Sequence, residues 1–193
     1  MPRRAPFILC MKDSQKKKWD AFYSSTKRED FLHLSDQQLD AILKEFPTAK
    51  TILDIGCGEG QLLTQLTMRG YDVTGIDVSP IALSRVDLDT TIITGDFENY
   101  RFGQTFDIIF AKFLVAFIEN LPNFFAKTHS LLNRDGGMVI ISPIVDGEKD
   151  EEIFIKKEDF ENGYRTYFDV RFDTSLYQEG NKRLAQVILT KRG

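Results

Sequence analysis

The chain has 193 residues, which corresponds to one domain and is enough to bury about two-thirds of the unfolded surface. With 25 basic and 29 acidic residues it is mildly acidic, which argues against nucleic acid as the main partner. Two cysteines are too few for a disulfide framework and favour a reducing compartment, by default the cytoplasm, and no apolar run is long enough to cross a membrane.

The N-terminal region is expected to place two helices ahead of the first strand. Residues 1–14 show no apolar period and are expected to be loose, with Met11 as an alternative start. Helical spacing of apolar residues follows in 15–49, where Ser35 and Gln38 form a capping box and Pro47 ends the second helix. We expect 15–49 to roof the site, and 50–193 to form the α/β core of a single domain, 1–193.

The stretch Thr51–Gly60 reads as a buried strand that turns sharply into a helix. Its glycines alternate, as in a turn whose bare backbone approaches a ligand, and the helix begins at Gln61. Asp54 ends the strand and Glu59 lies within the turn, so a pyrophosphate on this loop would face two carboxylates. The charges therefore favour a cationic ligand over a dinucleotide.

This stretch resembles motif I of the class I S-adenosylmethionine-dependent methyltransferases, and the resemblance covers roughly residues 50–143. It implies S-adenosylmethionine as the cofactor. Further motif matches follow in chain order, and together they imply the cofactor-binding residues Asp54, Gly56, Cys57, Gly58, Asp77, Val78, Asp96, Phe97 and Lys112.

Two more acids close predicted strands. The strand 71–77 ends in Asp77, whose two oxygens match the two ribose hydroxyls, and Ser79 with Pro80 begins the next helix. The strand 91–96 ends in Asp96, followed by Phe97. This pair suits an adenine, because the carboxylate accepts from the exocyclic amine and the ring covers a base face.

The second half of the chain completes the predicted sheet. A fourth strand, 105–111, leads into 112–118, which passes over the cofactor, and into a helix, 120–132, stopped by the glycines after Asp135. A fifth strand (138–142), an irregular acidic connection (143–162) and a C-terminal hairpin follow. The family resemblance implies a Rossmann-like doubly wound seven-stranded α/β sheet, order 3-2-1-4-5-7-6, with the last strand antiparallel.

No motif indicates a nucleophile or a general base, so the catalytic residues are unknown from sequence. Candidate proton acceptors are His33, Lys112 and Tyr23, and the two histidines with the two cysteines form no metal-binding cluster, so no metal is expected. The leading hypothesis is methyl transfer to a small-molecule substrate by in-line displacement. Two alternatives remain: an RNA or protein acceptor that uses the basic segment 12–18, and a regulatory module that binds the cofactor without catalysis. The sequence does not indicate an oligomeric state.

Overall fold

The computed structural model describes residues 13–24, 33–149, 151 and 153–192. The prediction of a loose N-terminus therefore lies mostly outside the described residues, although 13 and 14 begin helix α1, Asp13–Ser24. Within the described part of the chain, no helix combines the length and the apolar character needed to span a membrane.

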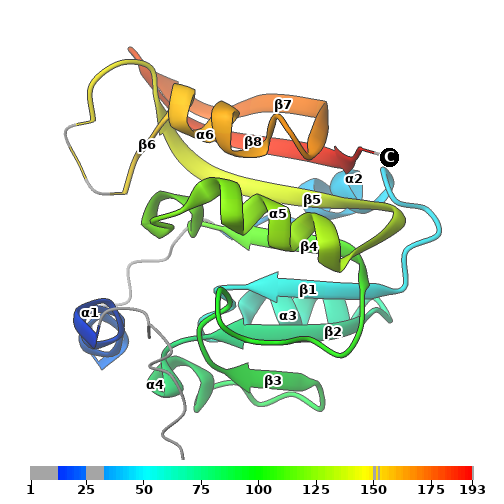
Figure 1. Cartoon of the computed structure of the whole chain (residues 1–193). Helices are drawn as coiled ribbons and strands as arrows, with labels where there is room; N and C mark the ends of the chain where they lie inside the picture. Colours follow the sequence, from blue (N-terminus) through cyan, green and yellow to red (C-terminus); the bar gives the residue numbers. More distant parts are fainter. Residues whose placement is uncertain (1–12, 25–32, 150, 152, 193) are drawn as a thin grey trace, which may run out of the picture.

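A single mixed sheet forms the centre of the molecule (Figure 1). Its long strands lie in the order β3-β2-β1-β4-β5-β8-β7, and β8 runs in the direction opposite to the other long strands. The predicted order is confirmed. The last two strands are numbered 8 and 7 instead of 7 and 6 because the two-residue strand β6, which pairs with β5, precedes them in the sequence. The strands are β1 (Thr51–Ile55), β2 (Asp72–Asp77), β3 (Thr91–Thr94), β4 (Phe106–Lys112), β5 (Leu132–Val145), β6 (Ile155–Lys156), β7 (Phe168–Glu179) and β8 (Lys182–Lys191).

Helices cover both faces of the sheet. In Figure 1, α5 and α6 lie in front of it and α2 and α3 behind, and each pair buries its apolar residues in a separate core. The two central strands, β1 and β4, consist mostly of buried apolar residues, as strands covered on both faces require. The remaining helices are α2 (Asp36–Leu43), α3 (Gln61–Thr67), α4 (Pro80–Leu83), the 3-10 turn η1 (Val115–Phe117), α5 (Leu121–Leu131) and α6 (Lys157–Tyr164).

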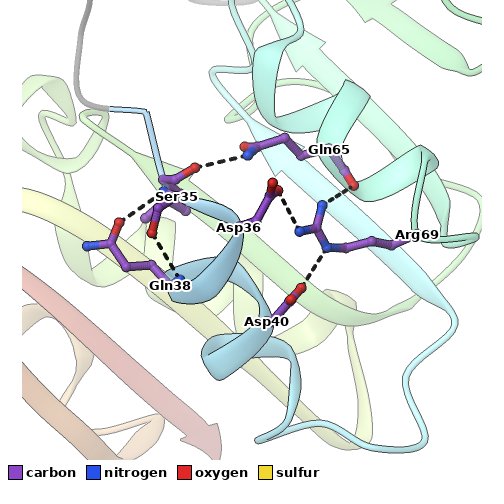
Figure 2. A network of polar contacts seen from close by, with 7 residues as sticks. Ser35, Asp36, Gln38, Asp40, Gln65 and Arg69 are labelled. Atoms are coloured by element: carbon purple, nitrogen blue, oxygen red, sulfur yellow. Dashed lines mark hydrogen bonds and ion pairs between the residues drawn. The ribbon is translucent and has the colours of Figure 1, made fainter.

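Helix α2 is joined to α3 by a polar network in addition to its apolar stripe (Figure 2). The predicted capping box is present, since the Ser35 side chain accepts from the Gln38 amide and Gln38 accepts in return from Ser35. Arg69, two residues after the end of α3, donates to Asp36 at 2.7 Å and to Asp40 at 2.8 Å. These contacts fix α2 against the rear face of the sheet.

Two predicted boundaries in the second half were wrong. Helix α5 ends at Leu131, one residue before its predicted end. The fifth strand, predicted to begin at Met138, begins at Leu132, because the glycines expected to separate helix from strand lie in and next to a bulge inside the strand. Asn133 holds this bulge by donating to Asp107 at 2.6 Å. The segment 143–162, predicted to be irregular, extends β5 to Val145 and contributes β6 and most of α6.

Candidate active site

A cavity of about 260 Å³ lies at the carboxyl ends of the central parallel strands. Its lining comes from the glycine turn after β1, the ends of β2 and β4, the loop after β3, and helix α1. Figure 1 shows α1 at this edge of the sheet, next to α4. Ligands of open α/β sheets bind at the carboxyl ends of the strands, where the strand order reverses, and β1 and β4 flank that point here.

The glycine turn adopts a backbone conformation in which other residues would be strained. Gly56, Gly58 and Gly60 have φ values of 73°, 54° and 78°, all in the left-handed region. A Cβ on Gly60 would also lie 2.9 Å from a Val86 methyl carbon, and a Cβ on Gly58 would lie 2.6 Å from the Tyr23 hydroxyl. The alternating glycines are therefore required by both the turn and its neighbours.

Asp54, the next-to-last residue of β1, faces the cavity with only 3% of its surface exposed. Burial raises the pKa of its carboxyl group to about 7, partly opposed by the positive charge of Lys112. Lys112 lies at the end of β4, and burial lowers the pKa of its ammonium group. A buried carboxylate that resists ionisation would gain stability from a cationic ligand.

Asp77 connects two loops of the cavity. One carboxylate oxygen accepts from the Gly58 amide at 2.9 Å, and the other accepts from the Ser79 amide at 2.8 Å. Burial raises its pKa, whereas these backbone donors lower it. Asp77 thus supports the fold of the glycine turn, and each oxygen retains a lone pair for a ligand.

The sequence interpretation assumed that Glu59 contributes negative charge to the cavity. In the structure this charge is neutralised by a basic residue. Glu59 forms an ion pair with Arg85, a residue that the sequence reasoning did not single out. The two residues are 26 positions apart, so no local pattern signals the pair. The acidic character of the site rests on Asp54 and Asp77.

The loop after β3 contributes one of its two predicted residues directly. Phe97 lines the cavity together with Gly95, whereas the Asp96 side chain is outside the lining. The Asp96 carboxylate instead accepts from the Glu98 amide at 3.0 Å and from the Asn99 side chain at 2.6 Å. Cys57 and Val78, the other predicted residues, both lie in the lining.

Of the two N-terminal helices expected over the site, only α1 lies there. Trp19, Phe22 and Tyr23 line the cavity, and Trp19 packs edge-to-face on Phe117 of η1 at 5.1 Å between ring centroids. Burial and the nearby Asp77 raise the pKa of the Tyr23 hydroxyl above its ordinary value, so Tyr23 keeps its proton. Helix α2 packs on the rear of the sheet because its apolar stripe joins that core.

Further lining residues have only weak sequence signals or none. Phe113 has a φ of 54°, which is rare for an aromatic residue, and lies in the segment predicted to cross the cofactor. Ile153 reaches the cavity from the long connection before β6. Among the described residues, no group of histidine, cysteine and acidic side chains is placed to hold a metal ion.

Comparison with known proteins identifies the family. The family model described as a methyltransferase domain matches residues 27–172, about three-quarters of the chain. The chain belongs to the class I S-adenosylmethionine-dependent methyltransferases. The matched region of this methyltransferase contains every predicted cofactor-binding residue.

Curated relatives are similar over part of their length. A dTDP-3-amino-3,4,6-trideoxy-alpha-D-glucopyranose N,N-dimethyltransferase of Streptomyces venezuelae is 25% identical over 65% of this methyltransferase and 55% of the relative. A ubiquinone biosynthesis O-methyltransferase of Pseudomonas paraeruginosa is 31% identical over 49% of this chain and 44% of the relative. The chain thus spans about half the length of these proteins.

The fold also matches solved structures. Geranyl diphosphate C-methyltransferase from Streptomyces coelicolor A3(2), solved with Mg2+, geranyl diphosphate and S-adenosyl-L-homocysteine, superposes with a TM-score of 0.75. The match covers 93% of this methyltransferase and 98% of that chain, at 11% identity. At this identity the likeness shows the shared fold alone.

The residues present fit the family's cofactor, S-adenosylmethionine. The cofactor carries an ammonium and a sulfonium, and the cavity offers two buried carboxylates, Asp54 and Asp77. Its carboxylate requires a donor or a cation, and Lys112 lies in the same lining. The glycine turn supplies a bare backbone against which the cofactor would lie.

Proposed function

We propose that this chain transfers a methyl group from S-adenosylmethionine to a small, largely apolar acceptor. The observation that carries the proposal is the pairing of buried Asp54 and Asp77 with an aromatic roof over one cavity. The cofactor supplies a methyl group on a sulfonium, which is already an activated donor. The named activities of the curated relatives, on an amino sugar nucleotide and in ubiquinone biosynthesis, also support a small acceptor.

The acceptor side of the cavity favours an apolar molecule. Its walls are Trp19, Phe22, Phe113, Leu114 and Phe117, which present aromatic and aliphatic surface. Such surfaces bind ligands by burial and shape, and a few polar groups set the orientation. The roof also restricts access, which is more compatible with a small molecule than with a folded protein or an RNA helix.

The chain's own residues support positioning more than proton transfer. The described lining contains no histidine and Tyr23 keeps its proton, and we assign Asp54 and Lys112, whose pKa values burial shifts, to the charged groups of the cofactor. We therefore expect the acceptor atom to reach the methyl group without its proton or to lose it to water. Alignment of two reactants alone can lower a barrier by about 7–11 kcal/mol.

A binding and transfer experiment tests the proposal. Calorimetry should show binding of S-adenosylmethionine and S-adenosylhomocysteine but not of NAD. Asp77→Ala should weaken cofactor binding by about 1.5–3 kcal/mol, the loss typical for a hydrogen bond to a charged group. The matched control is Asp72→Ala, an exposed carboxylate at the other end of β2, which should leave the affinity unchanged.

Transfer is then measured with a panel of acceptors bearing nitrogen, oxygen, sulfur and carbon nucleophiles, with mass spectrometry for the gain of one methyl group. Methylation of apolar small molecules would support the proposal. Tight cofactor binding without transfer to any class would favour a regulatory module. Methylation of RNA with steeply salt-dependent binding would favour a nucleic-acid acceptor.

A further inference from the structure

Lys127 of α5 lies outside the cavity lining and makes three hydrogen bonds to a single loop. Its ammonium donates to the carbonyl oxygens of Phe97 at 2.5 Å, Glu98 at 3.1 Å and Tyr100 at 2.6 Å. An ammonium group has three donors, so one lysine uses its full capacity on the loop between Asp96 and Tyr100. The lysine is 27 or more positions from these residues, so the contacts are tertiary.

The same loop carries the two residues predicted to contact adenine. Asp96 closes the loop by accepting from Glu98 and Asn99, and Phe97 lines the cavity. The Lys127 ammonium also lies 4.8 Å from the centroid of the Phe97 ring, within cation–π range. The lysine thus holds both the backbone and the ring of the cavity-lining residue.

The conformation of this loop depends on the positive charge of the Lys127 ammonium group. Three carbonyl oxygens converge on one point, and without a donor there they would repel one another and lose hydrogen bonds. Phe97 would then be free to leave its place against Phe124 and Phe102, on which it packs at 5.4 and 5.9 Å between centroids. A change at Lys127 therefore reaches the cavity through Phe97.

We propose that Lys127 is a positioning residue for the adenine side of the cofactor site. It shapes the loop that holds Phe97 in the cavity lining and Asp96 just outside it, where each Asp96 oxygen keeps a lone pair for the amine of an adenine that lies on Phe97. Lys127 itself is not part of the lining. The inference rests on the proposed function, since it assumes that S-adenosylmethionine occupies this cavity.

The test measures binding of S-adenosylhomocysteine and of its deaminated analogue, S-inosylhomocysteine, by calorimetry. Lys127→Met keeps the aliphatic stem and removes the donors. It should weaken binding of S-adenosylhomocysteine by about tenfold or more, as expected for lost hydrogen bonds to a charged group. The inosine analogue, which lacks the exocyclic amine, should lose less, so that the two affinities converge.

Controls separate this role from a general loss of stability. Lys44→Met makes the same change at an exposed lysine after α2 and should leave both affinities unchanged. Lys127→Arg keeps the charge and should restore part of the preference for adenine, and it replaces the methionine variant if that variant does not fold. With an acceptor in hand, the KM for S-adenosylmethionine should rise more than kcat falls.

The outcomes discriminate between the proposals. An equal loss for both ligands, or no loss, would overturn the role of Lys127 and leave the proposed function intact. A wild-type protein that binds neither ligand would overturn the proposed function, and the inference with it.

Discussion

At the scale of single residues, the pKa of Asp54 couples the cavity to pH. Its ordinary value of 3.8 is raised to about 7, chiefly because burial penalises the charged form of the carboxyl group. In the ligand-free protein the folded state therefore holds this proton more tightly than the unfolded chain does. The contribution of Asp54 to stability is present below pH about 4 and is lost as the pH rises through 7.

Binding of a cationic cofactor should show the opposite dependence. The ionised carboxylate attracts the ligand, so we expect affinity for S-adenosylmethionine to increase by up to about tenfold per pH unit below pH 7 and to level off above it. Calorimetry in buffers of different ionisation enthalpy would measure the proton released on binding. Asp54→Asn should flatten the profile, and a profile that stays steep in this variant would assign the titration to another group.

At the scale of elements, helix α1 is attached to the cofactor loops by a small set of polar contacts. The Ser79 hydroxyl, before α4, donates to Asp20 at 2.6 Å. Arg85, after α4, donates to the Tyr23 carbonyl at 2.7 Å and pairs with Glu59 of the glycine turn. The roof is therefore fastened to the site at both the middle and the end of the helix.

These attachments predict an effect on ligand exchange. Asp20→Ala removes the bond to Ser79 and should release S-adenosylhomocysteine faster, with a smaller effect on the association rate, because an open roof no longer retains the product. Stopped-flow displacement would measure the rate. Lys16→Ala is the matched control, since it removes the Lys16–Asp20 ion pair and leaves the Ser79 bond in place. Equal acceleration in both variants would contradict the attachment role.

Elements with local signals could be predicted from the sequence. The capping box at Ser35, the glycine turn and the acid at the end of β2 depend on neighbours a few residues apart, and each lies where its pattern indicated. Helix α6 was missed because its charged sequence has few apolar residues to mark a period. The position of α2 also had no local signal.

The polar contacts of the candidate site also divide into those that a local sequence pattern predicts and those that it does not. Asp54 and Asp77 follow from strand ends, whereas the Arg85–Glu59 pair and the Lys127 contacts join residues more than 25 positions apart. Such contacts arise only when the sheet brings distant loops together. The sequence accordingly indicates that Asp54 and Asp77 face the cavity, but it indicates neither that the Asp96 side chain bonds within its own loop nor that Arg85 neutralises Glu59.

At the scale of the whole molecule, the rear helical layer and the sheet meet at Gly137 in β5. A Cβ at this position would lie 2.5 Å from a ring carbon of Phe46 and 2.7 Å from the Leu189 carbonyl oxygen. The ring could shift, but the carbonyl belongs to the neighbouring strand β8 and is held by the sheet. Phe46, three residues after the end of α2, therefore packs directly on this glycine.

Gly137→Ala should destabilise the fold by about 1–3 kcal/mol, the usual cost of overpacking a core. For a chain of this size the melting temperature should fall by roughly 2–4 °C for each kcal/mol. Chemical denaturation would measure the change in free energy of unfolding. Gly103→Ala is the control, because a Cβ there has no neighbour within 4 Å, and comparable losses in both variants would refute the packing argument.

The position of β8 also determines when the sheet can be completed as the chain folds. This strand follows β7 in the sequence but lies between β5 and β7 in the sheet. As the chain emerges during synthesis, β7 has no partner and the long edge of β5 stays uncovered until residues 182–191 are available. A chain interrupted before Lys182 would expose an apolar strand edge of the kind that pairs with other chains, and it would aggregate even though its cofactor loops are complete.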